Sequence, residues 1–366
     1  MKWPWRPVII GGVPGARLVN RRPLHTLEHW RHANVNSRKL LVRPRITTYL
    51  IGGLWAMASG AFAQPAVVAW PAKPIRMVVP FAAGGPADAT ARLLAPRLTE
   101  YLGQQVVVDN RGGAGGLIGI DIIAKSPADG HHVLLMSSSI VILPSMRRVM
   151  PYDTQRDIAP VTDVLHAPFA LVVHPSLPAR NADELVKLAK AKPGQLMYPS
   201  AGVGGTNHLS GVQFSIAAGI DTVHVPYKGT APALTDLAAG QVHFQFSMPL
   251  AVMPLVQAGK LRMIGIAAGK RLPDIPDLPT VSESGVPGFE TAVWYGFFTT
   301  GGVPRDIVSR LHVDMARALA VPEVRHKLTP GGARLGGGKP EAFAAFMRSE
   351  IVKWVTVVKA AGIKPE

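Results

Sequence analysis

Two turns in this chain carry the residue types best suited to bind a small anion. The first, residues 81–88 (FAAGGPAD), places Gly84 and Gly85 directly before an expected helix, and the second, residues 200–208 (SAGVGGTNH), repeats that design with hydroxyl and imidazole groups. A helix start leaves backbone N–H groups unpaired at the positive end of the helix dipole. Glycine lets a ligand approach the backbone closely. Each turn therefore predicts an anion site, and we expect the anion to be a carboxylate.

The residues expected to contact the anion belong to these turns and to the ends of nearby strands. They are Phe81, Ala83, Gly84, Gly85, Asp88, Ser137, Ser138, Ser200, Gly204, Gly205, Thr206, His208, Tyr227, Lys228 and Ser247.

Several of these residues also fit a purely structural role. Asp88 suits its own helix start better than an anion, because two like charges repel. The hydroxyls of Ser137 and Ser138 suit a carboxylate or a solvated turn equally well. His208 either donates a hydrogen bond to a ligand or fixes its loop. Lys228 would attract an anion, although an exposed lysine is usually only solvated.

Alternating apolar strands and helices position these turns. Strands are expected at residues 75–81, 106–108, 133–136, 169–173, 196–198, 222–225, 242–246, 262–267 and 291–299, and helices at 87–102, 117–125, 182–192, 231–239, 250–258, 305–320 and 340–361. This rhythm predicts parallel sheets covered by helices, with ligands bound beyond the carboxyl ends of strands. The glycine loop 112–116 is expected to serve only as a turn, and Trp294 and Tyr295 to lie in the core rather than on a cleft wall.

The strand–helix units fall into two similar series, which predicts an α/β fold of two lobes with a cleft between them. We expect each lobe to be a mainly parallel sheet flanked by helices, and two strands to cross between the lobes. Residues 64–168 and 292–366 are expected to form lobe 1, and residues 169–291 lobe 2.

Charge does not indicate nucleic-acid binding, although the formal net charge of the 366 residues is +16. Residues 1–63 alone hold ten Lys or Arg and one acidic residue, and the remainder is spread along the chain without a long basic run. A mildly basic body suits a small anionic ligand. There is no cysteine, which excludes disulfides and thiolate chemistry.

The first 63 residues are expected to lie outside the fold. The apolar run 49–63 follows several arginines and ends in Ala61-Phe62-Ala63, which is typical of a signal peptide cleaved between Ala63 and Gln64. It is shorter than the roughly 20 residues of a membrane-spanning helix. Residues 1–34 fit no signal design, so we expect translation to start nearer residues 35–42.

Enzyme motifs are missing from the sequence. There is no G-x-G-x-x-G fingerprint, P-loop, H-E-x-x-H or G-x-S-x-G pattern, and the twelve histidines show no metal-ligand spacing. We therefore expect neither a cofactor nor a metal. A secreted hydrolase built on Ser200 and His208 stays open as an alternative, although no third group to orient the imidazole is evident.

Several longer stretches together resemble one known family. KPIRMVVPFAAGGPADATAR, VVVDNRGGAGGLIG, HVPYKGTAPALTDLAAGQV, AGKLRMIGIA and PDLPTVSESGVPGFE occur in this order between residues 70 and 364. They resemble the Bug family, the solute-binding proteins of tripartite tricarboxylate transporters. The resemblance implies a monomeric periplasmic binding protein of the two-lobed type II (Venus flytrap) fold. It also implies that backbone N–H groups and waters of residues 81–88 and 200–208 hold a small carboxylate, which is delivered to a membrane permease. A receptor that signals to a membrane sensor stays an alternative.

The sequence departs from that family's pattern at informative positions. Ala82 and Ala83 replace prolines, and Val203 and Gly205 stand where Asn and Thr or Ser are common. Ser247 stands where many members carry an aspartate that can pair with a ligand amine. The absence of that aspartate favours a plain carboxylate over an amino acid as the ligand.

Overall fold

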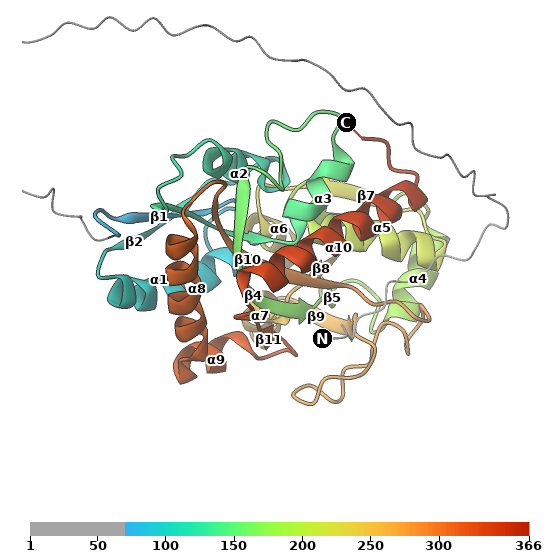
Figure 1. Cartoon of the computed structure of the whole chain (residues 1–366). Coiled ribbons are helices and arrows are strands. Elements are labelled where there is room, and N and C mark those ends of the chain that lie inside the picture. Colours follow the sequence, from blue (N-terminus) through green and yellow to red (C-terminus); the bar gives the residue numbers. More distant parts are fainter. Residues whose placement is uncertain (1–69, 366) are drawn as a thin grey trace, which may run out of the picture. The chain divides into compact units, whose positions relative to one another are not determined.

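The computed structural model describes residues 70–365, which lie within one compact unit (Figure 1). The expected signal peptide, its cleavage point and the expected later start all fall outside the described residues. Within the described part, no helix combines the length and the apolar character that crossing a membrane requires.

Lobe 1 is built on a six-stranded sheet with the strand order β11-β4-β10-β3-β1-β2. Its core strands are short apolar runs such as IRMVV in β1, which are buried on both faces because helices pack against them. In Figure 1, α10 crosses in front of the sheets, and it packs against α3 and β4. The elements of this lobe are β1 (Ile75–Val79), α1 (Pro86–Leu102), β2 (Val106–Asn110), the 3-10 turn η1 (Ala114–Gly116), α2 (Leu117–Ala124), β3 (His132–Ser137), α3 (Ser139–Met146), β4 (Ile158–Pro168), β10 (Ala292–Thr300), α8 (Arg305–Ala320), α9 (Pro322–Leu328), β11 (Arg334–Leu335) and α10 (Pro340–Ala360).

Lobe 2 has two smaller sheets, ordered β8-β5-β9 and β6-β7. Four aromatic rings fill its centre between α5 and the strands, with centroids 5.3–6.1 Å apart: Phe214, Phe244, Phe246 and Phe289. The elements are β5 (Ala170–Val173), α4 (Ala182–Ala191), β6 (Met197–Ser200), α5 (Thr206–Ala218), β7 (Val223–Pro226), α6 (Thr230–Ala238), β8 (Phe244–Ser247), α7 (Pro249–Gln257) and β9 (Arg262–Ile266).

The α/β fold of two lobes is as predicted, but the expectation of mainly parallel sheets is wrong. Only β1–β2, β1–β3 and β6–β7 pair in parallel among the named strands, whereas β10 runs antiparallel to both β3 and β4. The reason is topological. β4 leads out of the six-stranded sheet and β10 leads back into it, so two neighbouring strands that carry the chain in opposite directions must run antiparallel.

Most predicted strands and helices are confirmed within a few residues, but some elements, among them β4 and α3, were missed. β4 reads IAPVTDVLHAP, and its prolines disfavour a central strand. It is nevertheless paired on both sides, and register shifts in its pairing with β10 accommodate the irregularity. The sequence of α3, SIVILPSM, is wholly buried along most of its length and lacks helical periodicity.

The chain passes from the six-stranded sheet to the three-stranded sheet between Pro168 and Ala170 and returns at Ala292. The exact lobe boundaries stay a prediction.

Candidate functional site

A small, partly open cavity of about 30 Å³ lies where the two lobes meet, with room for about two water molecules. Residues of both lobes line it: Phe81, Gly85, Pro86, Ala87, Ser137, Ser139, Phe169, Ala201, Thr206, Asn207, Thr230, Ser247, Met248, Val293 and Tyr295. None of these side chains carries a charge. Any anion bound here must therefore be held by hydrogen bonds and backbone dipoles.

Five helices of the described chain begin at this cavity. α1, α3, α5, α6 and α7 each contribute a lining residue from their N-cap or first position, and in none of them does an N-cap side chain occupy the free N–H groups. α4, which starts away from the cavity, is different, because Asn181 accepts a hydrogen bond from the N–H of Glu184. The positive ends of these five helices, with their unpaired backbone N–H donors, therefore lie at the cavity.

The first glycine turn places only part of its predicted residues on the cavity. Phe81 and Gly85 line it, whereas Ala83 and Gly84 are exposed and lie outside the lining. The N–H of Gly84 donates to Asp88 Oδ2 at 3.0 Å. Asp88 also pairs with Arg92, as its structural role predicts. Burial acts to raise the pKa of Asp88, but the hydrogen bonds from Arg92, Gly84 and Asn110 outweigh it and hold this pKa below its usual value.

The second glycine turn is held by neutral groups. Thr206 reaches the cavity, while Ser200, Gly204, Gly205 and His208 lie behind it. The N–H of Gly204 donates to His208 Nδ1 at 3.3 Å, so this imidazole fixes its loop. Ser200 Oγ lies 2.6 Å from Nε2 of another histidine, the one at position 224, rather than from His208.

The two imidazoles behind this turn are stacked and uncharged. The rings of His208 and His224 lie 3.9 Å apart between centroids. Burial lowers the pKa of His208 to about 4, and burial together with the neighbouring His208 lowers the pKa of His224 to about 3. Ser200 is fully buried. The alternative that pairs Ser200 with His208 is not what the structure has, because the Ser200 hydroxyl bonds to the ring of His224 on β7 and His208 Nδ1 accepts from Gly204.

The serine run at the end of β3 joins the two lobes. Ser138 Oγ lies 2.8 Å from Thr206 Oγ1, and the N–H of Thr206 donates to Ser139 Oγ at 3.3 Å. Ser137 donates to Ser139 at 3.0 Å. Ser137 and Ser139 line the cavity and Ser138 does not. These hydroxyls are thus placed both to reach a ligand and to hold the lobes together.

Backbone contacts between glycine loops bring the lobes together at a second place. The N–H of Ala82 donates to the carbonyl of Lys228 at 3.1 Å, and a Cβ on Gly229 would lie 2.8 Å from the nitrogen of Ala82. A Cβ on Gly115 would collide with the carbonyl oxygen of Val203. The loop 112–116 is therefore more than a turn, because its glycines let lobe 1 approach lobe 2.

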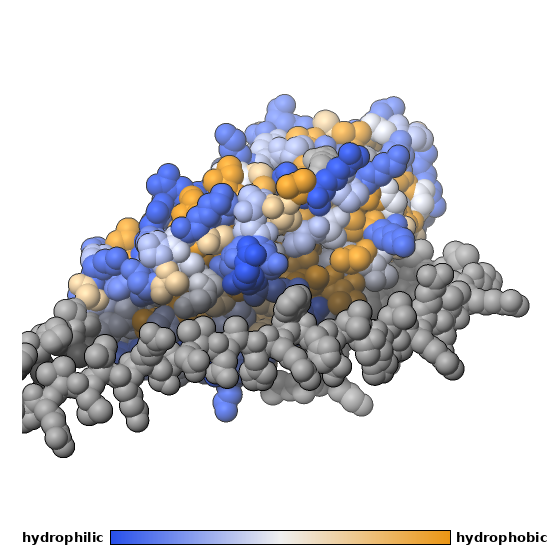
Figure 2. All heavy atoms as spheres, turned by 45° about the horizontal axis from the view of Figure 1, so that its top comes forward, coloured by the Kyte–Doolittle hydropathy of each residue, from blue (hydrophilic) through white to orange (hydrophobic). Residues whose placement is uncertain are grey.

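Tyr227 and Lys228 lie apart from the cavity. They line a wider groove of about 640 Å³ that also includes Ala82, Val203 and Arg147. The Tyr227 hydroxyl donates to Asp236 Oδ2 at 2.5 Å, and Lys228 is exposed. On the face drawn in Figure 2, hydrophilic and hydrophobic residues are interspersed.

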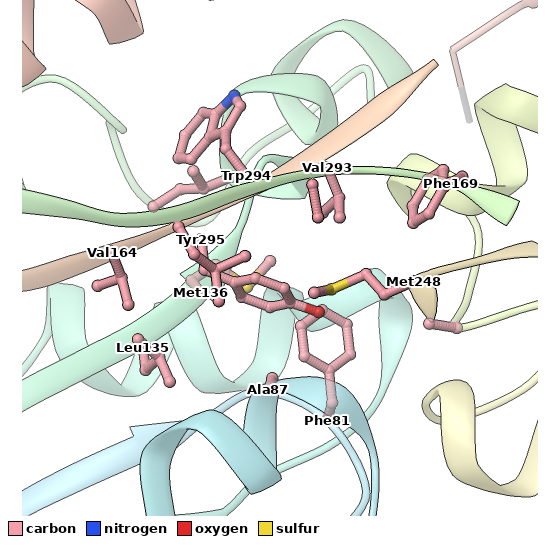
Figure 3. Packing of buried hydrophobic residues seen from close by; sticks show 14 of the residues in the cluster. Phe81, Ala87, Leu135, Met136, Val164, Phe169, Met248, Val293, Trp294 and Tyr295 are labelled. Atoms are coloured by element: carbon pink, nitrogen blue, oxygen red, sulfur yellow. The ribbon is translucent and has the colours of Figure 1, made fainter. Parts of the chain in front are cut away.

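Sequence reasoning missed several cavity residues. Tyr295 was expected in the core, and it is buried there, yet its ring also lines the cavity. Figure 3 shows its hydroxyl directed toward Phe81 and Met248, whereas Trp294 points to the other side of the strand. Thr230 had a usable signal, because it follows Gly229 in the same strand–glycine–helix pattern as the two predicted turns. No sequence signal, apart from a place at the end of a strand, marks the cavity residues Phe169, Val293 and Met248.

The family described as the tripartite tricarboxylate transporter family receptor (TctC) matches residues 90–363. The protein BugT of Bordetella pertussis is 35% identical over 314 residues, which cover 85% of this chain and 96% of BugT. Among solved structures, R. palustris Rpa4515 with adipate is 39% identical with a TM-score of 0.78, and the match covers 81% of this chain and all of that one. MatC (Rpa3494) from Rhodopseudomonas palustris, with bound malate, is 31% identical with a TM-score of 0.74, and the match covers 79% of this chain and all of MatC.

These similarities span both lobes, and they identify a family of solute-binding receptors rather than enzymes. The hydrolase alternative is therefore wrong. The chain belongs to the tripartite tricarboxylate transporter receptor family and, as the resemblance predicted, to its Bug proteins.

Proposed function

We propose that this protein is a periplasmic receptor that captures a small organic carboxylate in the cavity between its lobes. The observation that carries the proposal is the convergence of five helix starts on a cavity without a charged side chain. Helix N-termini with free N–H groups stabilise an anion, and five of them around one space leave a neutral ligand little advantage. The relatives with bound adipate and malate support the same ligand class.

Capture requires the lobes to separate and close again. Room for about two water molecules is less than a dicarboxylate of four to six carbons needs, so the contacts across the lobes must open for this ligand to fit. Hinge closure on a bound ligand is a common motion of two-lobed binding proteins. The hydroxyl pair Ser138–Thr206 and the Ala82–Lys228 backbone bond are the contacts that would break and re-form.

Delivery completes the proposed function. The closed receptor hands its ligand to the membrane permease of a tripartite tricarboxylate-type transporter, and it acts as a monomer exported by the signal peptide at residues 49–63. A mature periplasmic protein that begins at Gln64 would support the export step, and retention of residues 49–63 in that protein would contradict it.

The test is ligand-dependent thermal stability, because a ligand that binds only the folded protein raises its melting temperature. Linear dicarboxylates of four to six carbons, including malate and adipate, are each compared with the corresponding diamide, which has a similar shape without the charge. We expect at least one acid to raise the melting temperature by several degrees while its diamide does not. Equal shifts by acid and diamide, or no shift by any acid, would refute the proposal.

A further inference from the structure

Tyr295 carries a hydroxyl that makes no hydrogen bond with any residue of the described part of the chain. The residue is 5% exposed, and it lines the cavity. Buried polar groups in native proteins are nearly always paired, because an unpaired one destabilises the fold. The unused phenol therefore points to a partner that enters the cavity.

The phenol of Tyr295 is directed into the space where the lobes meet. Tyr295 is opposite Ser137 in the antiparallel pair of β10 and β3, so both side chains lie on the face of the six-stranded sheet that borders the cavity. The long side chain of Tyr295 carries its hydroxyl away from this sheet, toward Phe81 and Met248 (Figure 3). Met248 is the N-cap of α7, so the hydroxyl points toward a helix start of the other lobe.

The other hydroxyls that line the cavity differ from that of Tyr295. Those of Thr206 and of the serine run bond to one another. Those of Thr230 and Ser247 have no partner among the described residues, but they belong to α6 and β8 of lobe 2. Within the described residues, Tyr295 is therefore the one cavity residue of the six-stranded sheet with an unused hydroxyl.

Contacts on the opposite face of β10 hold Tyr295 in place. Trp294 points away from the cavity, and its indole N–H donates to Glu350 Oε2 of α10 at 3.1 Å. The indole N–H of Trp354 donates to the same oxygen at 3.3 Å, and Glu350 is 7% exposed. A buried carboxylate that accepts from two indoles fixes β10 against α10, so the phenol is oriented before a ligand arrives.

The protonation state of Tyr295 makes its hydroxyl a permanent donor. Burial raises the pKa of this phenol, so it keeps its proton at physiological pH. None of the side chains that line the cavity carries a charge, and thus none of them competes with an anion for this donor. Hydrogen bonds to an ionised group are roughly twice as strong as those between neutral groups. The phenol therefore suits an ionised carboxylate better than an amide or an ester.

Resting on the proposed function, we propose that Tyr295 is a specificity-determining residue whose hydroxyl donates to the carboxylate of the bound ligand. The helix starts attract the charge, and the phenol adds a hydrogen bond from β10, the strand that returns the chain to the six-stranded sheet. This contact favours an ionised carboxylate over an uncharged ligand of the same shape.

The test is Tyr295→Phe, which removes only the hydroxyl. Calorimetry with the acid that gives the largest thermal shift should show about 20-fold weaker binding, because a buried hydrogen bond to a charged group is lost. The melting temperature of the ligand-free protein should not fall, since this hydroxyl has no partner in the described chain. Affinity within about twofold of wild type would overturn the inference, because the phenol would then serve no ligand. Weaker binding with a lowered melting temperature would also overturn it, because the role would be structural.

Tyr152→Phe is the matched control. Tyr152 is 7% exposed, its hydroxyl is buried without a hydrogen-bond partner, and it does not line the cavity. This variant should bind the acid as wild type does, and an equal loss of affinity in both variants would overturn the inference. If carboxylates bind the wild-type protein and only the effect of Tyr295→Phe is missing, the role of Tyr295 is wrong and the proposed function stands. If no carboxylate binds the wild-type protein, both are wrong.

Discussion

The two glycine turns share a backbone design and are stabilised in opposite ways. At α1, an ionised side chain fixes the turn: Asp88 accepts from Gly84 and pairs with Arg92. At α5, a neutral imidazole takes the corresponding place, because His208 Nδ1 accepts from the N–H of Gly204. In both turns the accepting residue lies four positions after the donating glycine. The two turns share a backbone conformation, so the chemical identity of the accepting side chain determines how the stability of each turn depends on pH.

This difference matters because both turns must present free N–H groups to one cavity. A carboxylate next to an anion site raises the cost of binding unless a cation neutralises it, and Arg92 does so at α1. The stacked pair of His208 and His224 needs no such partner while both rings are neutral. Lobe 1 therefore carries a turn insensitive to pH near neutrality, and lobe 2 carries one that protonation can disturb.

The largest expected effect concerns the close approach of Gly115 to Val203, which allows the two lobes to close. In Gly115→Ala the new methyl group would collide with the carbonyl of Val203 in the second turn, so the lobes could not close fully. We expect carboxylate affinity to fall about 100-fold, or about 2.7 kcal/mol, by calorimetry. Gly103→Ala is the matched control, because Gly103 has nearly the same φ (+68° against +67°) and no atom within 4 Å of the added methyl group.

Wild-type affinity in both glycine variants would show that lobe contact at Val203 is not needed for binding. Equal and large losses of affinity would mean that backbone strain at positive φ, and not the contact, is responsible.

The second-largest expected effect concerns the loss of Asp88, and it compares the turn before α1 with the helix start of α4. Asp88→Ala should lower the free energy of unfolding by about 2 kcal/mol, because it removes a buried acceptor from Gly84 and Arg92. Asp183→Ala is the control, since Asp183 pairs with Lys187 at the same spacing at the start of α4 but its side chain is 48% exposed. Urea unfolding should show a loss below about 1 kcal/mol there. Similar losses in both variants would mean that burial of Asp88 adds nothing.

Sequence patterns could predict the two lobes and both turns, because a strand followed by glycines and a helix is a pattern of residues that are close together in the sequence. They could not show which N–H groups stay free, since that depends on acceptors such as Asp88 and His208 folding back onto their own loops. They also misjudged Tyr295, whose apolar strand looks like core on both faces although one face borders the cavity. The partner of Ser200 was missed because His224 arrives from the neighbouring strand.

The smallest effect is a pH dependence of stability to which the turn of lobe 2 contributes through His208 and His224, whereas the turn of lobe 1 does not contribute. Both histidines titrate in the folded protein well below their usual value of 6.5, at about 4 for His208 and about 3 for His224. The unfolded chain therefore binds more protons than the folded chain as the pH falls through 6.5, and stability is lost in that direction. Between pH 7.5 and 6 the free energy of unfolding should fall by about 1 kcal/mol for each histidine. Asp88, whose pKa is lowered, contributes a constant amount over this range.

Replacing the His224 ring tests whether the change in the free energy of unfolding with pH comes from the pair of His208 and His224. His224→Gln should reduce the slope, because it removes one of the two histidines of this turn and leaves an amide beside Ser200. His326→Gln, in the last turn of α9 on the surface, should leave the slope as in wild type. Urea unfolding at pH 7.5, 6.75 and 6 gives the three slopes. If the wild-type protein is equally stable across this range, or if His224→Gln keeps the full slope, the two turns do not differ in the way their acceptors imply, and another group governs the response of lobe 2 to acid.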